Sequence, residues 1–229
     1  MSKAAAVIVA AGEGRRMGGP VRKQYLPLEG VPVLARTVRA FTGSILFSQI
    51  ILVAPVGEVE LCRDVLKPYC RMDLLHLVEG GARRQDSVLS GLVEVREENE
   101  LVCIHDGVRP LVSRELIASV LEMAAGHGAA IPGIAVTDTI KELNEDNTIQ
   151  STIPRRKIRL AQTPQAFRRK LIQGAYQQAS LLGIEATDDS YLLELMDYPV
   201  QVLPGDPVNL KITGPHDLVL AVAYLKGGS

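Results

Sequence analysis

The sequence predicts a single α/β domain, in which a mostly parallel, twisted sheet carries helices on both faces and a projecting β-arm. Two observations lead to this prediction. Short apolar runs alternate with stretches of helical periodicity, which is typical of strands buried on both faces and joined by right-handed crossovers. One segment, residues 136–154, interrupts this alternation and has the composition of an exposed hairpin.

Apolar runs predict the strands and amphipathic stretches predict the helices. Ala4–Ala10 (AAAVIVA) is the first strand, and its uninterrupted apolar character indicates burial on both faces. Further strands are expected at Gln49–Ala54, Leu74–Val78, Leu101–His105, Val200–Leu203 and Val208–Ile212. Helices are expected at Val33–Phe41, Val59–Leu66, Asp86–Arg96, Arg114–Ala125, Arg168–Leu182, Asp189–Met196 and His216–Leu225. Ser113 is the expected N-cap of the fourth helix, because its hydroxyl can accept an orphan amide.

The arm is expected within residues 136–154, where Thr and Ile flank an Asn-Glu-Asp-Asn cluster. The segment has too few large apolar residues for a core element. A two-stranded hairpin facing solvent is marginally stable alone, so we expect it to pack on a second copy of the chain. The alternative is an unattached surface excursion.

The composition excludes several classes of protein. A length of 229 residues suits one domain spanning residues 1–229, because domains contain roughly 150 residues. The 47% hydrophobic residues exclude a disordered chain. Lys and Arg number 25 against 26 Asp and Glu, which argues against coating nucleic acid or an anionic membrane. With 4% aromatic residues and no Trp, a base-stacking single-strand binder is also disfavoured.

Three features predict a cytoplasmic protein. The apolar runs are far shorter than a membrane span, and no basic segment precedes Ala4 as it would in a signal peptide. The cysteines, Cys62, Cys70 and Cys103, lack CxxC spacing and cannot all be paired, so we expect reduced thiols.

A glycine-containing loop follows the first predicted strand. It begins Ala10-Ala11-Gly12-Glu13-Gly14, and its position after a parallel strand is where open sheets bind ligands. The dinucleotide fingerprint GxGxxG fails, because Met17 occupies its third glycine position. The nearby cations Arg15, Arg16, Arg22 and Lys23 instead favour a triphosphate. A solvated basic turn is the alternative.

Three further sites carry chemistry. Asp106 ends a predicted central strand, where it could meet a metal or a substrate hydroxyl, and Arg109 could bind phosphate or carboxylate. An internal salt bridge between these two is compatible with both roles, and His105 is expected to be a core histidine. Gly80–Ser87 follows a strand and opens a helix, so it could read a base edge or simply cap the helix. Lys211 lies in an apolar stretch and needs an anionic partner.

These motifs occur in one order along the chain: AAGxGRRM, KQY, GGxxRxDSV, HDxxRP, VTDTIK, TPQ and NLKIT. In that order they resemble the family of 2-C-methyl-D-erythritol 4-phosphate cytidylyltransferases. The resemblance implies a Rossmann-like nucleotidyltransferase fold and the transfer of CMP from CTP to 2-C-methyl-D-erythritol 4-phosphate. It implies Mg²⁺, held mainly by the CTP phosphates with Asp106 nearby. It also implies a homodimer in which the β-arm reaches the other subunit's site, with no nucleic acid or membrane as partner.

The resemblance also implies roles for individual residues. The catalytic group comprises Arg16 and Lys23, which stabilise charge at the triphosphate, and Arg155 and Lys211, which position the attacking phosphate. The nucleotide-binding group comprises Ala10, Ala11, Gly12, Gly14, Gly81, Ala82, Ser87 and Gly107. The substrate-binding group comprises Asp106, Arg109, Thr139, Thr163 and Thr187, with Thr139 and Arg155 supplied by the partner's arm.

Two positions depart from the family's usual form. The family usually has Asp where this chain has Ala82, and Ala where this chain has Gly107. The effect of these two changes is mild if backbone groups contact the nucleotide. If a side chain recognises cytosine instead, the changes alter base selectivity. Three other functions compete with this interpretation. They are a cytidylyltransferase for another polyol phosphate such as ribitol 5-phosphate, a non-catalytic nucleotide-binding module, and a dinucleotide-dependent oxidoreductase, which the broken fingerprint disfavours.

Overall fold

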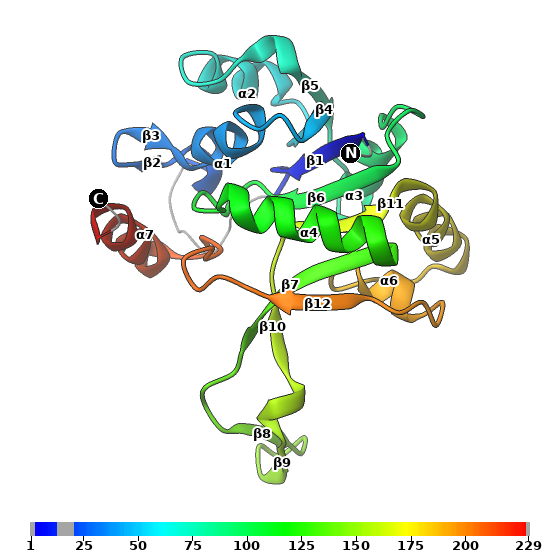
Figure 1. The fold of residues 1–229 in the computed structure, drawn as a ribbon. Helices are drawn as coiled ribbons and strands as arrows, with labels where there is room; N and C mark the ends of the chain where they lie inside the picture. The colour runs from blue at the N-terminus through cyan, green and yellow to red at the C-terminus, as the bar shows by residue number, and fades with distance from the viewer. Residues whose placement is uncertain (1–2, 13–20, 228–229) are drawn as a thin grey trace.

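The structure is a computed structural model that describes residues 3–12 and 21–227. Its core is an eight-stranded sheet in the order β10-β7-β11-β6-β1-β4-β5, with β12 also paired to β7 (Figure 1). The strands of the parallel half are β1 Ala4–Val9, β4 Phe47–Ala54, β5 Leu75–Glu79 and β6 Leu101–Asp106. All four were predicted from apolar runs, and their parallel pairing confirms the predicted α/β fold class.

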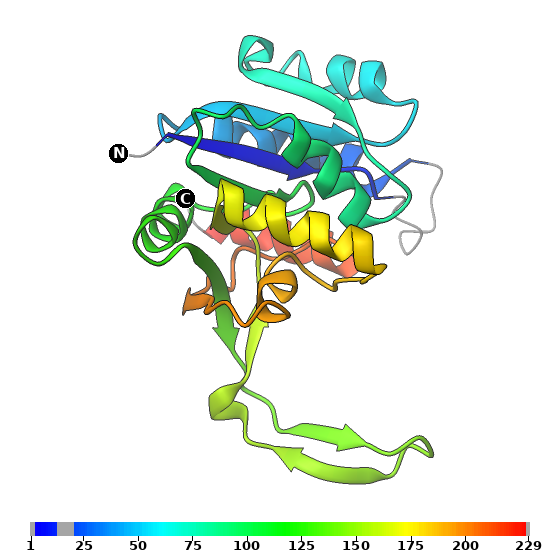
Figure 2. The ribbon, with the colours of Figure 1, turned by 90° about the vertical axis from the view of Figure 1, so that its right-hand side faces the viewer.

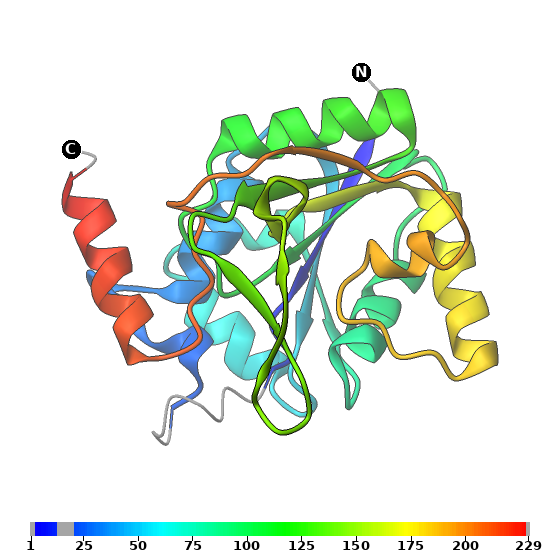
Figure 3. The ribbon, with the colours of Figure 1, turned by 90° about the horizontal axis from the view of Figure 1, so that it is seen from below.

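Helices cover both faces of the sheet. Along β1, Ala4, Ala6 and Ile8 pack with α1 (Val33–Thr42), α2 (Val59–Leu66) and α4 (Arg114–His127). The alternate residues Ala5, Val7 and Val9 pack with α3 (Arg84–Val93), α5 (Arg169–Leu182) and α6 (Tyr191–Glu194). This division follows from the two-residue period of a strand. Figures 1 and 3 place α5 and α7 (Pro215–Gly227) at opposite sides of the sheet.

Sequence periodicity missed three strands of the other half. They are β7 (Ala129–Ala135), β10 (Arg159–Ala161) and β11 (Gln165–Arg168). β7 (AAIPGIA) is interrupted by Pro132 and Gly133, and the other two strands are only three and four residues long, so none gives a clear local signal. β11 runs antiparallel between β6 and β7, and this pairing is what joins the two halves. β12 (Gln201–Pro204) was predicted and pairs with β7 in parallel.

The predicted strand at Val208–Ile212 is wrong. These residues form an irregular segment without strand pairing. Its backbone groups form hydrogen bonds within turns. The Asp206 carboxylate accepts from the Val208 amide, and the Val208 carbonyl accepts from the Leu210 amide. The Ile212 amide donates to the Val108 carbonyl, which ties the segment to the loop after β6. The alternating apolar residues therefore reflect packing against that loop and not a ladder.

The predicted hairpin is present. β8 (Ile140–Leu143) and β9 (Ile149–Ile153) pair antiparallel as a separate two-stranded sheet. Figure 2 shows this arm extending away from the main sheet as a twisted ribbon. Leu143 and Ile149 are paired near its tip and are 51% and 61% exposed. The arm therefore presents apolar surface that this single chain does not cover.

Helix ends are set by local contacts that shift them from the predicted positions. α3 begins at Arg84, two residues before the predicted start, because the Asp86 carboxylate in its first turn accepts the Arg83 amide. α4 ends at His127, and its C-cap Gly128, with a φ of +92°, closes the helix in the left-handed region. Across the described residues, no helix is both long and apolar enough to cross a membrane.

The N-cap of α4 gives a test of local stability. The Ser113 hydroxyl accepts the Leu116 amide at 3.1 Å, as predicted. Ser113→Ala should lower the free energy of unfolding by about 1 kcal/mol, because that amide loses its partner. Ser113→Asp keeps an acceptor and should stay close to wild type. Urea denaturation followed by circular dichroism measures both, and equal stability of wild type and Ser113→Ala would contradict the capping role.

Candidate active site

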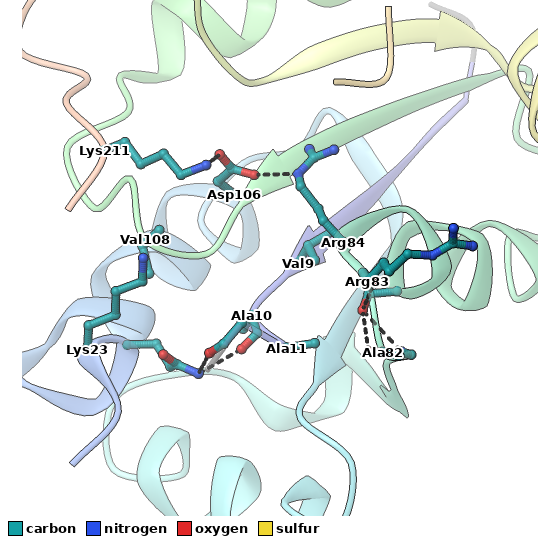
Figure 4. Close-up of a pocket in the computed structure, with 14 residues that line it drawn as sticks. Val9, Ala10, Ala11, Lys23, Ala82, Arg83, Arg84, Asp106, Val108 and Lys211 are labelled. Atoms are coloured by element: carbon teal, nitrogen blue, oxygen red, sulfur yellow. Dashed lines mark hydrogen bonds and ion pairs between the residues drawn. The ribbon is translucent and has the colours of Figure 1, made fainter. Parts of the chain in front are cut away.

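The carboxyl ends of β1, β5 and β6 converge on one pocket of about 170 Å³ (Figure 4). The parallel pairing of β1 with both β4 and β6 brings these ends to the same edge of the sheet. The pocket is lined by Val9, Ala10, Ala11, Gly12, Lys23, Gln24, Gly81, Ala82, Arg83, Arg84, Ser87, Asp106, Val108 and Lys211. Four of these are cations and Asp106 is the one acid among them, so the lining suits an anionic ligand.

The loop after β1 is held by the short helix η2 (Lys23–Tyr25). The buried Gln24 side chain donates to the carbonyls of Ala10, at 2.8 Å, and Gly12, at 3.2 Å. Glu58, before α2, holds the same turn through the Arg22 guanidinium and the Tyr25 hydroxyl. These contacts place Lys23, which is adjacent to Gln24, at the wall of the pocket that Ala10, Ala11 and Gly12 also line.

The turn between β5 and α3 needs its two glycines for close approach. A Cβ at Gly80 would lie 2.5 Å from the Ala11 Cβ and 2.7 Å from the Ser87 Oγ, and a Cβ at Gly81 would overlap Asp86. The Ser87 hydroxyl accepts from the Gly81 amide at 3.1 Å and donates to the Arg83 carbonyl at 3.0 Å. Ser87 therefore shapes the turn, and Ala82 at its apex faces the pocket.

Three cations surround the Asp106 carboxylate at the end of β6. The Lys211 Nζ lies 2.8 Å from Oδ2, and the Arg84 Nε lies 3.2 Å from Oδ1. The Arg109 Nε is 3.8 Å from Oδ2. Figure 4 shows Lys211 and Arg84 approaching the carboxylate from opposite sides. Burial alone would raise the pKa of Asp106, but the charges of Arg84, Lys211 and Arg109 outweigh it and hold that pKa below its usual range.

His105 and Thr163 support Asp106 from behind. The His105 Nε2 lies 3.3 Å from the Arg109 carbonyl, which can only accept, so this nitrogen carries the proton. The Nδ1 is then the acceptor for the Thr163 hydroxyl at 3.0 Å. The same hydroxyl oxygen accepts the Asp106 amide at 3.0 Å. His105 is fully buried, as expected for a core histidine, and burial lowers its pKa to about 3.

Comparison with known proteins identifies the family. The family model for 2-C-methyl-D-erythritol 4-phosphate cytidylyltransferase matches residues 4–227. The chain belongs to this family. A curated relative of that name from Syntrophus aciditrophicus is 44% identical over 225 residues, covering 98% of this chain and 96% of the relative.

Solved structures agree with this assignment. The 4-diphosphocytidyl-2C-methyl-D-erythritol synthase of Anaerococcus prevotii has a TM-score of 0.88 and 32% identity, covering 98% of this chain and 96% of that one. The 2-C-methyl-D-erythritol 4-phosphate cytidylyltransferase of Thermus thermophilus has a TM-score of 0.79 and 35% identity, covering 96% and 98%. The family resemblance drawn from the seven motifs is confirmed, and the chain is a nucleotidyltransferase.

The structure brings most of the predicted site residues together. The pocket gathers Ala10, Ala11, Gly12, Lys23, Gly81, Ala82, Ser87, Asp106 and Lys211. Gly14 and Arg16 lie outside the described residues. Gly107 packs behind Ala10, since a Cβ added to it would lie 3.1 Å from the Ala10 Cβ and 3.0 Å from Leu34. The Gly107 position is therefore one of close packing, whereas Ala82 lines the pocket itself.

Other predicted residues lie away from the lining. Arg109 is 8% exposed and donates to the Asn209 carbonyl at 2.8 Å, so it fixes the segment that carries Lys211. The Thr163 hydroxyl is engaged with His105 and Asp106, and Thr187 is exposed in the loop between α5 and α6. Thr139 and Arg155 flank the base of the arm, where the Arg155 guanidinium donates to the Thr137 carbonyl.

Five pocket residues received no role from the sequence, namely Val9, Gln24, Arg83, Arg84 and Val108. Of these, Gln24 and Arg84 lie within the motifs KQY and GGxxRxDSV. The sequence prediction gave no signal for Arg84, because the predicted helix begins at Asp86. The structure makes Arg84 the first residue of α3, where a cation is disfavoured by the helix dipole unless acids compensate it. The acids are Asp106 and Asp189, which are too distant in sequence to be paired with it by inspection.

The buried His105 gives a test of pH dependence. Its pKa of about 3 lies below the value in an unfolded chain, so the unfolded state binds a proton first as the pH falls. Stability due to His105 is therefore present near neutral pH and is lost between about pH 6.5 and about pH 3. Wild type should lose up to about 1.4 kcal/mol more unfolding free energy per pH unit in this window than His105→Asn. Urea titrations at a series of pH values measure both slopes, and equal slopes would contradict the neutral buried state.

Proposed function

We propose that this chain transfers the cytidylyl group of CTP to 2-C-methyl-D-erythritol 4-phosphate in the pocket at the ends of β1, β5 and β6. The products are 4-diphosphocytidyl-2-C-methyl-D-erythritol and pyrophosphate, in the nonmevalonate isoprenoid pathway. The observation that carries the proposal is the convergence of Lys23, Lys211 and Arg84 on one pocket that Gly12 and Gly81 also line. The three free cysteines support the expectation that the enzyme works in the reducing cytoplasm.

The reaction needs positioning and charge neutralisation more than acid–base chemistry. An oxygen of the acceptor's phosphate attacks the α-phosphorus of CTP, the new P–O bond forms, and the bond to pyrophosphate breaks in line. The attacking phosphate monoester is already anionic near neutral pH, so no general base has to remove a proton. The barrier lies in bringing two polyanions together. A pocket with four cationic side chains and one carboxylate suits that task.

Each side chain is assigned a role from the substrate group that it can contact. Lys23 and the loop amides after β1, together with Arg16, stabilise the triphosphate as charge develops on pyrophosphate. Lys211, joined by Arg155 of the partner subunit, positions the attacking phosphate. Asp106 accepts hydroxyl groups of the acceptor, because its ionised carboxylate is an acceptor only. Ala82 and the Gly81 amide face the nucleotide base.

The donor set fits Mg²⁺ bound through substrate phosphates. In the described part of the chain, no group of three or more His, Cys, Asp or Glu side chains could hold a metal ion. Asp106 is the single carboxylate in the lining, which agrees with the preference of Mg²⁺ for one or two carboxylates plus phosphates and water. When bound with CTP, Mg²⁺ supplies charge neutralisation at the phosphates.

A homodimer would give the arm its function. Thr139 directly precedes β8 and Arg155 lies two residues after β9, so both are at the base of the hairpin. The hairpin points away from the sheet of its own chain (Figures 1 and 2). The exposed apolar residues Leu143 and Ile149 favour burial of the arm against another surface. A second copy that accepts the arm would bring Arg155 of the partner subunit to the acceptor side of the pocket.

Substrate choice is tested by pyrophosphate release. Purified protein with Mg²⁺ should release pyrophosphate only with CTP and 2-C-methyl-D-erythritol 4-phosphate, and mass spectrometry should show the cytidylylated alcohol. ATP, UTP and ribitol 5-phosphate serve as parallel substrates. Release with ribitol 5-phosphate alone would assign another acceptor, and CTP binding without any release would indicate a non-catalytic module.

The trans contribution of Arg155 is tested by mixing variants. Lys23→Ala should lower kcat by about 10²- to 10³-fold, because one aimed cation is lost at the transition state. Arg155→Ala should be similarly impaired. After subunit exchange, an equal mixture should recover about a quarter of wild-type activity, since half of the dimers then carry one intact site.

Lys23→Ala mixed with Lys211→Ala is the matched control. Both residues line the pocket of one chain, so no mixed dimer would regain an intact site. Exchange is verified by native mass spectrometry. If exchange occurs and the Lys23→Ala and Arg155→Ala mixture stays inactive, each site is built within a single chain.

A further inference from the structure

Arg84 joins two acidic groups that lie far apart in the sequence. Its Nε donates to the Asp106 Oδ1 at 3.2 Å. Its Nη1 and Nη2 donate to the two Asp189 carboxylate oxygens at 2.9 and 2.8 Å. Asp189 is fully buried and does not line the pocket. One guanidinium therefore connects a carboxylate in the active site with a carboxylate buried in the protein.

The contact chain continues to α5. The Tyr176 hydroxyl donates to the Asp189 Oδ1 at 2.5 Å. Tyr176 is 2% exposed, and its ring packs in the core between the sheet and α5. A continuous path of charge-assisted hydrogen bonds thus runs from Tyr176 through Asp189 and Arg84 to Asp106.

The bidentate pair determines the orientation of Arg84. Two parallel N–H···O bonds to one carboxylate fix the plane of a guanidinium, which a single contact would leave free to rotate. With that plane fixed, the Nε–H direction is fixed as well, and it points at the Asp106 Oδ1 (Figure 4). Lys211 holds the other oxygen at 2.8 Å, so the Asp106 carboxylate has a defined orientation toward the pocket.

The same pair acts on a second part of the acceptor side. Asp189 lies two residues after Thr187, in the loop between α5 and α6. Gln85, next to Arg84, also holds this loop by donating to the Ile184 carbonyl at 3.0 Å and accepting the Ala186 amide at 2.9 Å. The first turn of α3 therefore links the Thr187 loop to Asp106.

Charge balance gives Asp189 a further effect. The carboxylates of Asp106 and Asp189 compensate two of the three cations gathered here, Arg84, Arg109 and Lys211. Arg84 donates to the two carboxylates through Nε, Nη1 and Nη2, and its side chain is 30% exposed. The Lys211 side chain, paired with Asp106, is 38% exposed. Loss of the Asp189 charge would therefore leave a second uncompensated cation beside Asp106.

We propose that Arg84, Asp189 and Tyr176 are positioning residues that set the acceptor subsite and leave the nucleotide subsite unaffected. The inference rests on the proposed function, because it assigns Asp106 and Thr187 to the polyol phosphate. Arg84 holds the Asp106 carboxylate in the orientation that accepts hydroxyl groups. Asp189 and Tyr176 act only through Arg84 and through the loop that carries Thr187.

The test separates the Michaelis constants of the two substrates. Tyr176→Phe removes one hydroxyl and keeps the ring in the core, and Asp189→Asn removes one charge at constant shape. Tyr176→Phe should raise KM for 2-C-methyl-D-erythritol 4-phosphate by about three- to tenfold, and Asp189→Asn by about ten- to a hundredfold. KM for CTP should change by less than about twofold in both, since the glycine turn and the β1 loop keep their own contacts.

Two further variants complete the test, one as a control and one as a second way to disrupt the contact chain. Tyr198→Phe is the matched control, because its hydroxyl donates to the His127 carbonyl at 3.1 Å outside this contact chain, and both KM values should stay as in wild type. Arg84→Lys keeps the charge but cannot contact both acids in a fork. It should reproduce the acceptor-specific rise even if a buried variant fails to fold.

The outcomes distinguish the inference from the proposed function. An unchanged acceptor KM in Tyr176→Phe, Asp189→Asn and Arg84→Lys, with wild type active, would overturn the positioning role. Equal rises for both substrates would indicate a general structural defect and would overturn it as well. Wild type that releases no pyrophosphate from CTP and 2-C-methyl-D-erythritol 4-phosphate would instead refute the proposed function. Thermal unfolding of each variant shows whether it is folded.

Discussion

The buried carboxylate of Asp106 is the constraint around which the site is organised. An ionised carboxylate that is 6% exposed requires cations and hydrogen-bond donors, because burial of an unpaired charge costs several kcal/mol. The cations come from three places in the chain, Arg84 in α3, Arg109 after β6 and Lys211 near the C-terminus. Each of these segments must therefore approach the end of β6, which draws the irregular segment around Lys211 against the sheet edge.

Close backbone approach is the second requirement. The glycine turn before α3 contacts the loop after β1 so closely that a side chain at Gly80 would collide with Ala11. Gln24 and Ser87 then use their side chains to hold backbone groups of the two loops. This wall of the pocket is consequently formed in large part by backbone and the small residues Ala10, Ala11, Gly12, Gly81 and Ala82. This suits a ligand recognised through amides, so Ala82 in place of an acid leaves the shape of the turn intact.

The residues that line the pocket are different from the buried residues that hold its parts in place. Lys23, Lys211 and Asp106 line the pocket, while Arg109, His105 and Thr163 are buried behind it and hold its parts in place. The neutral His105 carries its proton on Nε2 and relays a hydrogen bond to the backbone of Asp106 through Thr163. A reaction between two phosphates needs rigid placement of charge, and the hydrogen bonds that Arg109, His105 and Thr163 make behind the pocket favour that rigidity.

The sequence by itself determined the family and the parallel half of the sheet. Buried parallel strands are continuous apolar runs, and the loops that follow them are adjacent to those strands in the chain, so both leave local signals such as Ala4–Ala10. Only the tertiary structure decided the antiparallel half, since β7, β10 and β11 are stabilised by partners distant in the chain. It also corrected the strand at Val208–Ile212 and revealed Arg84 between Asp106 and Asp189. Pairings across 22 and 105 residues leave no periodicity in the sequence, because only the folded chain brings those charges together.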